Sequence, residues 1–284
     1  MTPESRRWTK LAAGIAEGYT GDANVEGIVL GGSVARGHAD ANSDVDIFVF
    51  CRKFPSDGMR KSAVVQTNGE RWKCHNNRRD TGVLRDCFWA DGGRIDVEFV
   101  LTEAFEAIIR DVLVACDISR SKQGFLGGLL DARTLYGDSL ISHWRERIEQ
   151  YPDALQKKVV ESHLFIEPLW IPEIYAGKRG DLLYLCDAIC RVSNDILGVL
   201  FGLNRLYQPT EYKRLDWLTS KFKIAPINLA TRLREVLEGT PLEGVKKIEQ
   251  ITEEMFALVK AHMPSMDISA ARAEFTTDTD TEPE

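Results

Sequence analysis

The pattern of apolar residues changes near the middle of the chain, and this change limits the folds that the chain can adopt. Between Val25 and Val100 the apolar runs are short, rich in β-branched residues and separated by turn residues, which is typical of strands. Beyond about Ser139 the pattern is helical, with breaks at prolines and glycines. A chain of 284 residues is long enough for two domains. We therefore expect a mixed-sheet α+β domain followed by an all-α helical bundle.

The turn and cap residues predict where individual elements begin and end. Asp91-Gly92-Gly93 predicts a hairpin turn in which both glycines accept positive φ. Thr102 is expected to cap the helix that follows the hairpin, and Pro168 and Pro172 are expected to kink or split a long helix. The expected strands are 25–30, 45–50, 70–75, 85–90 and 94–101. The expected helices are 3–18, 103–116, 140–150, 153–176, 180–203, 211–221, 227–238 and 242–263.

The charge distribution divides the chain further and disfavours one class of partner. The net charge is −7, and most of it comes from residues 267–284, an acidic tail that is expected to be disordered. The predicted division is a sheet domain over residues 1–138, a helical bundle over 139–266 and this tail. Because nucleic-acid-binding domains normally carry a basic excess, a nucleic-acid substrate is disfavoured. The oligomeric state is left open.

Nothing in the sequence predicts membrane insertion or secretion. The longest strongly apolar stretch, residues 196–203, is too short to cross a bilayer, and no secretory signal follows Met1. We therefore expect a cytoplasmic protein. The six cysteines form no CxxC pair and no zinc-type spacing with histidine, so buried, reduced thiols are expected.

A glycine-serine turn directly after an apolar strand is the first candidate binding feature. The strand over residues 25–30 is followed by Gly31, Gly32 and Ser33. Two glycines allow backbone N–H groups to approach an anion closely, and the serine adds a hydroxyl at the start of the next turn or helix. The turn predicts a phosphate-binding site, although the same three residues alone are equally compatible with a plain turn.

Two pairs of acidic residues in strands supply the second feature. Asp44 and Asp46 are separated by one residue, so both side chains lie on the same face of the sheet. Two such charges repel each other, and a divalent cation such as Mg²⁺ would compensate them beside a phosphate site. Asp96 and Glu98 form a second same-face pair in a later strand. If the two strands are neighbours, three or four carboxylates converge around metal ions; otherwise Asp96 and Glu98 face solvent.

These residues together resemble the nucleotidyltransferases of the DNA polymerase β superfamily. The resemblance rests on Gly31-Gly32-Ser33, on Asp44-Val45-Asp46 and on a later acid in an apolar strand, and it covers about a quarter of the chain. The run GGSVARGHADANSDVDIFV looks most like the adenylyltransferases that modify aminoglycosides and lincosamides. In that family a small N-terminal catalytic domain precedes a helical bundle.

The resemblance implies Mg²⁺, ATP and transfer of AMP to a hydroxyl with release of pyrophosphate. It implies that Gly31, Gly32 and Ser33 hold the triphosphate and that Asp44, Asp46 and Asp96 bind the metal. Asp96 would also accept the proton of the attacking hydroxyl, with Glu98 as the alternative. Arg36 and Lys213 are further candidates for binding phosphate, each with a plain solvent-exposed arrangement as the alternative.

The acceptor and the presence of turnover are the open questions. A small-molecule hydroxyl acceptor is expected, plausibly an aminoglycoside-type antibiotic, because acids that bind no metal attract ammonium groups. An alternative is modification of a protein side chain or an RNA end. A second alternative is a nucleotide-binding regulatory module without turnover. The retained pair of Asp44 and Asp46 argues against that module, because a plain binder has little need of two acids that repel each other.

Overall fold

The computed structural model describes residues 1–75 and 79–276, and these divide into two units. The first unit is Met1–Gln150 and the second is Tyr151–Glu284, so the division lies beyond the expected boundary at residue 138. Helix α6 (Asp138–Ile148) belongs to the first unit because its apolar face is buried there. The Trp144 ring of this helix lies 4.8 Å from Phe50 and 4.7 Å from Phe105, measured between ring centroids.

The first unit is built on a six-stranded mixed sheet with the order β3-β4-β5-β2-β1-β6. Its central pair, β2 and β5, is parallel, whereas the other neighbouring strands are antiparallel. The strands are β1 (Val25–Leu30), β2 (Val45–Cys51), β3 (Glu70–Cys74), β4 (Val83–Ala90), β5 (Gly93–Leu101) and β6 (Arg133–Tyr136). The predicted strands are thus confirmed to within two residues at each end, and the short edge strand β6 was not predicted.

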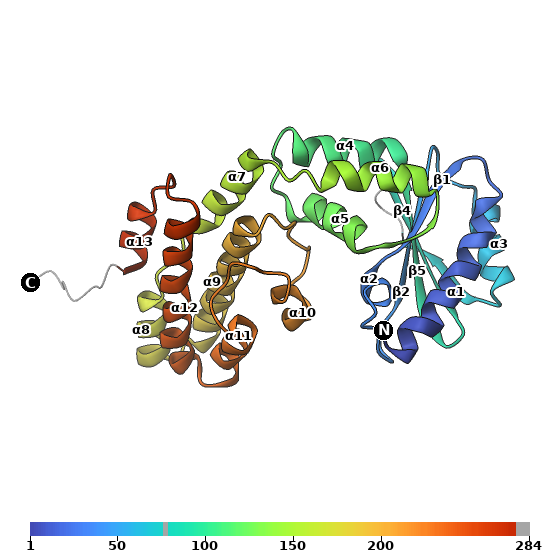
Figure 1. Cartoon of the computed structure of the whole chain (residues 1–284). Helices are drawn as coiled ribbons and strands as arrows, with labels where there is room; N and C mark the ends of the chain where they lie inside the picture. The colour runs from blue at the N-terminus through green and yellow to red at the C-terminus, as the bar shows by residue number, and fades with distance from the viewer. Residues whose placement is uncertain (76–78, 277–284) are drawn as a thin grey trace, which may run out of the picture. The chain divides into compact units, whose positions relative to one another are not determined.

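A separate pair of helices packs on each face of this sheet (Figure 1). Helices α1 (Pro3–Thr20) and α3 (Asp57–Gln66) pack on one face, where alternate residues of the central strands are fully buried. Helices α4 (Thr102–Leu113) and α6 pack on the other face, against Phe50 and Gly27. The remaining elements of the unit are α2 (Gly32–Ala35), α5 (Arg120–Asp131) and a short 3₁₀ turn, η1 (Arg79–Thr81).

Two predicted details of the hairpin region are wrong. The turn between β4 and β5 consists of two residues, and Asp91 and Gly92 are the ones with positive φ, whereas Gly93 begins β5. The added Cβ of any other residue at position 93 would lie 2.4 Å from Trp8, so packing explains this glycine. Thr102 does not cap α4, because Leu101 is the N-cap residue and the buried Thr102 hydroxyl makes no hydrogen bond within the described part of the chain.

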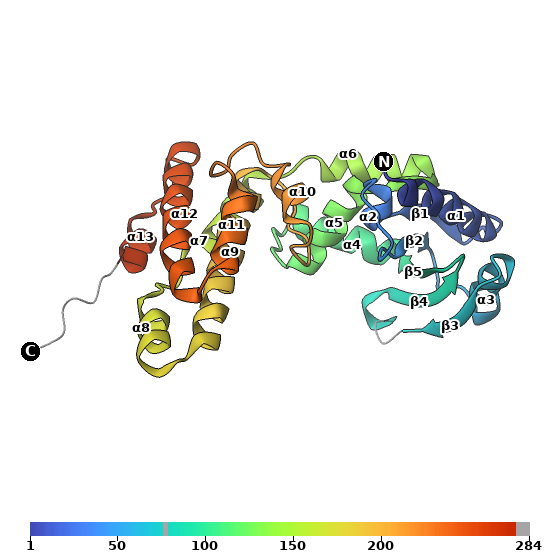
Figure 2. The same cartoon turned by 90° about the horizontal axis from the view of Figure 1, so that it is seen from below.

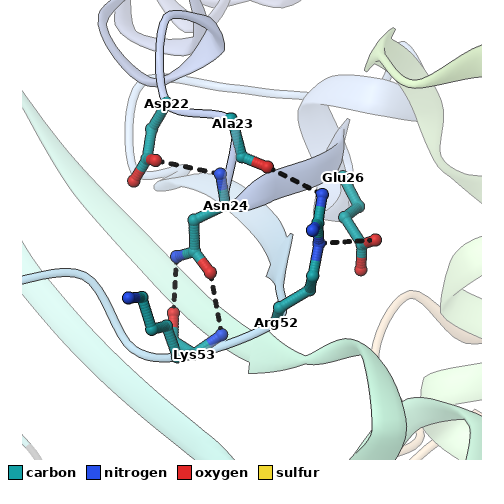
Figure 3. Close-up of polar contacts among 6 residues, drawn as sticks. All are labelled: Asp22, Ala23, Asn24, Glu26, Arg52 and Lys53. Carbon is teal, nitrogen blue, oxygen red and sulfur yellow. Dashed lines mark hydrogen bonds and ion pairs between the residues drawn. The ribbon is translucent and has the colours of Figure 1, made fainter.

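A set of polar contacts fixes the register of β1 and β2 at one end of the pair (Figure 3). The Asn24 side-chain amide donates to the Lys53 carbonyl at 2.7 Å, and its oxygen accepts from the Lys53 N–H at 2.9 Å. Arg52 donates to the Ala23 carbonyl at 2.9 Å and to the Glu26 carboxylate at 3.1 Å. These contacts hold the start of β1 against the end of β2, and therefore align the opposite end of the pair as well.

One buried ion pair joins β4 to α3, on the face of the sheet that α1 and α3 cover. Arg60 of α3 and Asp86 of β4 are 1% and 2% exposed, and their side chains are in direct contact. Arg60 also donates to Asp57 at 2.6 Å. Because a buried charge is costly without a partner, this pair ties α3 to the sheet.

The second unit is all-helical, and the long helix α9 (Leu182–Leu203) packs against α7, α8 and α12 (Figure 2). Around α9 are α7 (Asp153–Leu164), α8 (Trp170–Arg179), α10 (Leu215–Thr219), α11 (Leu229–Glu238), α12 (Pro241–His262) and α13 (Ser269–Thr276). The expected split of residues 153–176 is confirmed, because Pro168 lies between α7 and α8. The expected helix over 211–221 is only α10, since Arg214 has φ +55° and interrupts it.

Part of the expected disordered tail is helical. Ala271 and Phe275 of α13 are buried in the core of the second unit, and the Phe275 ring lies 6.0 Å from that of Phe256. Burial of these two apolar residues stabilises α13, although the tail as a whole is acidic. The expectation of disorder is therefore wrong for Ser269–Thr276. Residues 277–284 lie outside the described residues.

The remaining global expectations concern membranes and thiols. Within the described residues, no helix combines the length and the apolar character needed to span a membrane. All six cysteines are free thiols. Cys51 and Cys87 are buried as expected, whereas Cys74 and Cys190 are exposed and Cys116 and Cys186 are half-buried.

Candidate functional site

Three aspartates from two neighbouring strands form a compact carboxylate cluster. Asp46 lies in β2 and is the direct partner of Asp96 in the parallel strand β5. Asp44 precedes β2 by one residue and projects from the same face. One carboxylate oxygen of each residue lies within 4.8 Å of those of the other two. Hard oxygen ligands at this spacing suit a divalent cation such as Mg²⁺.

The glycine-serine turn contacts this cluster directly. The Gly31 N–H donates to the Asp46 carbonyl at 2.8 Å, which holds the turn against β2. Gly32 has φ +62°, and a Cβ at this position would lie 2.0 Å from the Asp46 Oδ2 atom. Only glycine therefore combines this backbone conformation with this approach. Ser33 follows in α2 and is half-buried.

The surroundings of Asp46 disfavour the ionised form of its carboxylate. Burial, followed by the charges of Asp44 and Asp96, raises the pKa of Asp46 from 3.8 to about 7. The positive charge of Arg85 acts in the opposite direction. A carboxylate that resists ionisation in this way gains free energy when a divalent cation neutralises its neighbours.

Two arginines that the sequence analysis missed bind Asp96. Asp96 is only 2% exposed, and its carboxylate contacts the guanidinium groups of Arg85 in β4 and Arg94 in β5. Arg94 reaches both carboxylate oxygens at 3.2 Å. The position of Arg85 near Asp96 was partly predictable from the hairpin sequence, because a two-residue turn at Asp91-Gly92 determines which β4 residues lie opposite those of β5. The sequence analysis included Gly93 in the turn, and this obscured the pairing.

Glu98 lies on the same face of β5 but outside the carboxylate cluster. It pairs in register with Phe48, two residues further along the strands than the pair of Asp46 and Asp96. Its carboxylate is 24% exposed and lies 3.9 Å from the Arg85 guanidinium. The structure thus brings Asp96, and not Glu98, next to Asp44 and Asp46.

The remaining predicted site residues, Arg36 and Lys213, belong to different units of the chain. Arg36 ends α2 and is half-buried beside the glycine-serine turn. Lys213 belongs to the second unit, where its exposed side chain forms an ion pair with Glu211 at 2.5 Å. Binding of phosphate by Arg36 or Lys213 stays a prediction.

Comparison with known proteins agrees with this geometry. Residues 17–89 match the model of a family described as nucleotidyltransferase domain, and this range includes the glycine-serine turn, Asp44 and Asp46. Residues 126–218 match a domain of unknown function (DUF4037). No curated protein matches the chain.

A solved structure, a nucleotidyltransferase-like protein from Exiguobacterium sibiricum 255-15, is similar with 11% identity and a TM-score of 0.37. The similarity covers 91% of this chain and 80% of that one. The fold is a polymerase-β-like mixed sheet followed by a helical region. Residues 17–89 of the N-terminal unit are therefore similar to a nucleotidyltransferase domain, and this stretch carries two of the three clustered carboxylates.

Proposed function

We propose that this protein transfers AMP from ATP to a hydroxyl group of a small molecule and releases pyrophosphate, with Mg²⁺ as the metal. The observation that carries the proposal is the contact between the glycine-serine turn and three clustered carboxylates. A phosphate-binding turn and a divalent-cation site in contact are what phosphoryl-type transfer from a nucleoside triphosphate requires.

The metal-binding residues in this proposal are Asp44, Asp46 and Asp96. Their oxygen atoms are close enough to share a cation. A bound cation would also offset the burial and the repulsion that raise the pKa of Asp46. A bound divalent cation supplies charge neutralisation at the triphosphate and favours ionisation of the attacking hydroxyl.

The residues of the chain perform the remaining tasks. The Gly32 backbone and the Ser33 hydroxyl bind the phosphate groups that leave as pyrophosphate. The acceptor oxygen forms a bond to the α-phosphorus while the bond from that phosphorus to the bridging oxygen of pyrophosphate breaks. The hydroxyl proton passes to Asp96, which lies beside Asp46. Glu98 remains the alternative base, because it lies on the same face two residues away.

The acceptor within this proposal is a small molecule with a free hydroxyl. The expectation of an aminoglycoside rested on carboxylates that attract ammonium groups. In the structure Asp96 contacts two guanidinium groups and Glu98 lies near one of them, so these two acids already have cationic neighbours. The aminoglycoside stays an untested prediction.

The test uses ATP labelled at the α-phosphate, with Mg²⁺ and a panel of hydroxyl compounds that includes aminoglycosides. We expect a labelled product and pyrophosphate, both abolished by chelation and in Asp44→Asn. Nucleotide binding that is unaffected by chelation and by Asp44→Asn would instead favour a regulatory module. Label found only on protein or RNA in a cell lysate would show that the acceptor is a macromolecule.

A further inference from the structure

The sheet face beside the carboxylate cluster carries a basic patch, which we define as Arg85 and Arg94. Arg85 lies opposite Glu98, and Arg94 lies opposite Trp89, in the β4–β5 pair. Paired residues of neighbouring strands project from the same face, which is also the face of Asp96. The two guanidinium side chains are 38% and 44% exposed, so solutes can reach them.

The strand order places this patch on the opposite side of the cluster from the phosphate-binding turn. The turn follows β1, the carboxylates lie on β2 and β5, and Arg85 lies on β4. Since neighbouring strands are about 4.8 Å apart, roughly 14 Å separates β1 from β4. Arg85 lies two strands away from β2, where Gly32 approaches Asp46, so it is not part of the glycine-serine turn.

In-line displacement determines which reactant reaches the basic patch. The attacking oxygen and the leaving oxygen lie on opposite sides of the phosphorus atom. If pyrophosphate leaves toward Ser33, the acceptor hydroxyl approaches from the side of β4 and β5, which carry Arg85 and Arg94, respectively. The patch therefore contacts the acceptor.

The charges on this side favour an anionic acceptor. The two guanidinium groups share the Asp96 carboxylate, and the only other acid on the same face of β4 and β5 is Glu98. A cation bound by the three aspartates competes for the negative charge of Asp96 and leaves the guanidinium groups with a surplus of positive charge. A phosphate or carboxylate group of the acceptor would satisfy these donors.

We infer that the acceptor is a hydroxyl compound bearing a phosphate or carboxylate group, bound by Arg85 and Arg94. This inference rests on the proposed function, since it assigns one side of the same site. It also predicts that a polycationic acceptor is disfavoured. The half-exposed Trp89 ring, 40% exposed beside Arg94, offers an apolar surface for the carbon skeleton of the acceptor.

The test measures binding of three matched sugars to the full chain loaded with Mg²⁺ and a non-hydrolysable ATP analogue. The probes are glucose 6-phosphate, glucose and glucosamine, which differ chiefly in charge. We expect glucose 6-phosphate to bind about tenfold or more tightly than the other two, as two charge-assisted hydrogen bonds imply. Equal binding of all three probes, including no binding, would overturn the inference, and so would preference for glucosamine.

Variants separate the basic patch from the rest of the site. Arg94→Gln should remove most of the preference for the anionic sugar and leave the affinity for the ATP analogue within about twofold. Glu98→Gln removes the competing negative charge near Arg85 and should strengthen binding of the anionic sugar. If Arg94→Gln weakens the nucleotide instead, Arg94 binds the triphosphate and the inference is wrong.

Binding of the Mg²⁺-nucleotide analogue is measured first, because it tests the proposed function separately from the choice of acceptor. Failure of the Mg²⁺-nucleotide analogue to bind would remove the proposed function together with the inference that rests on it. Successful loading without discrimination among the sugars would remove the inference alone.

Discussion

Replacing Asp46 by asparagine should stabilise the metal-free fold while abolishing activity. Burial and the charges of Asp44 and Asp96 raise the pKa of Asp46 from 3.8 to about 7. A group whose pKa is higher in the folded state stabilises the fold below its unfolded pKa, and this contribution is lost as the pH rises through the folded pKa. Wild-type protein therefore loses stability between about pH 4 and pH 7 from this one residue, whereas an amide cannot ionise and loses none.

The size of this effect follows from the same values. A tenfold change in an acid constant corresponds to about 1.4 kcal/mol, so ionising Asp46 costs the folded state up to about 4 kcal/mol. We therefore expect Asp46→Asn to stabilise the metal-free fold by about 2 to 4 kcal/mol at pH 8.5. The difference should shrink to less than about 0.5 kcal/mol at pH 4. Mg²⁺ should then stabilise the wild type more than the variant.

Urea titration in the presence of a chelator measures this difference. Tryptophan fluorescence reports mainly on the first unit, which contains Trp8, Trp72, Trp89 and Trp144. Glu146→Gln, a change at an exposed acid of α6, is the matched control and should alter stability little at either pH. A gain for Asp46→Asn that is equal at both pH values would refute the reasoning, because it would not arise from ionisation.

Three further predictions test other parts of the structure. Gly32→Ala should destabilise the fold by more than about 1 kcal/mol and reduce transfer at least tenfold, because position 32 has positive φ and the added Cβ would lie 2.0 Å from the Asp46 carboxylate. Gly14→Ala is the control: the added methyl group would lie in open space on α1, and it should stabilise the fold by about 0.5 to 1 kcal/mol in the same urea titration. Asp96→Asn should lower kcat by more than about 100-fold and Glu98→Gln by much less, measured as pyrophosphate release, and the reverse order would make Glu98 the base. Arg60→Met leaves its buried carboxylate partner unpaired and should cost about 3 to 5 kcal/mol, whereas a loss below about 1 kcal/mol would show that the ion pair is dispensable.

Five of the six strands of the first unit were predictable because their apolar residues are interrupted by turn residues at short intervals. Helix α5 was not predicted, since Gly124, Gly127 and Gly128 lower its intrinsic helix propensity. It forms nonetheless, with Gln123, Leu126 and Leu129 buried along one face. Tertiary burial therefore outweighs local propensity in this segment.

The carboxylates of the site were predictable, but their surroundings were not. Alternation along each strand indicated that Asp44 and Asp46 share a face and that Asp96 and Glu98 share a face. The choice between Asp96 and Glu98 as the neighbour of Asp46 depends on the register of β2 against β5, which no local pattern encodes. The arginines on Asp96 were missed for a related reason, because the length of the hairpin turn determines which residues face each other.

The parallel pairing of β2 with β5 has a consequence for biosynthesis. Asp46 and Asp96 become neighbours only when β5 has inserted between β2 and β4. A nascent chain that has left the ribosome only as far as β4 already carries Asp44, Asp46 and the glycine-serine turn, yet it lacks the third ligand. If the three aspartates bind a divalent cation as proposed, that cation stabilises the domain fully only after β5 has paired with β2, and it stabilises shorter nascent chains less.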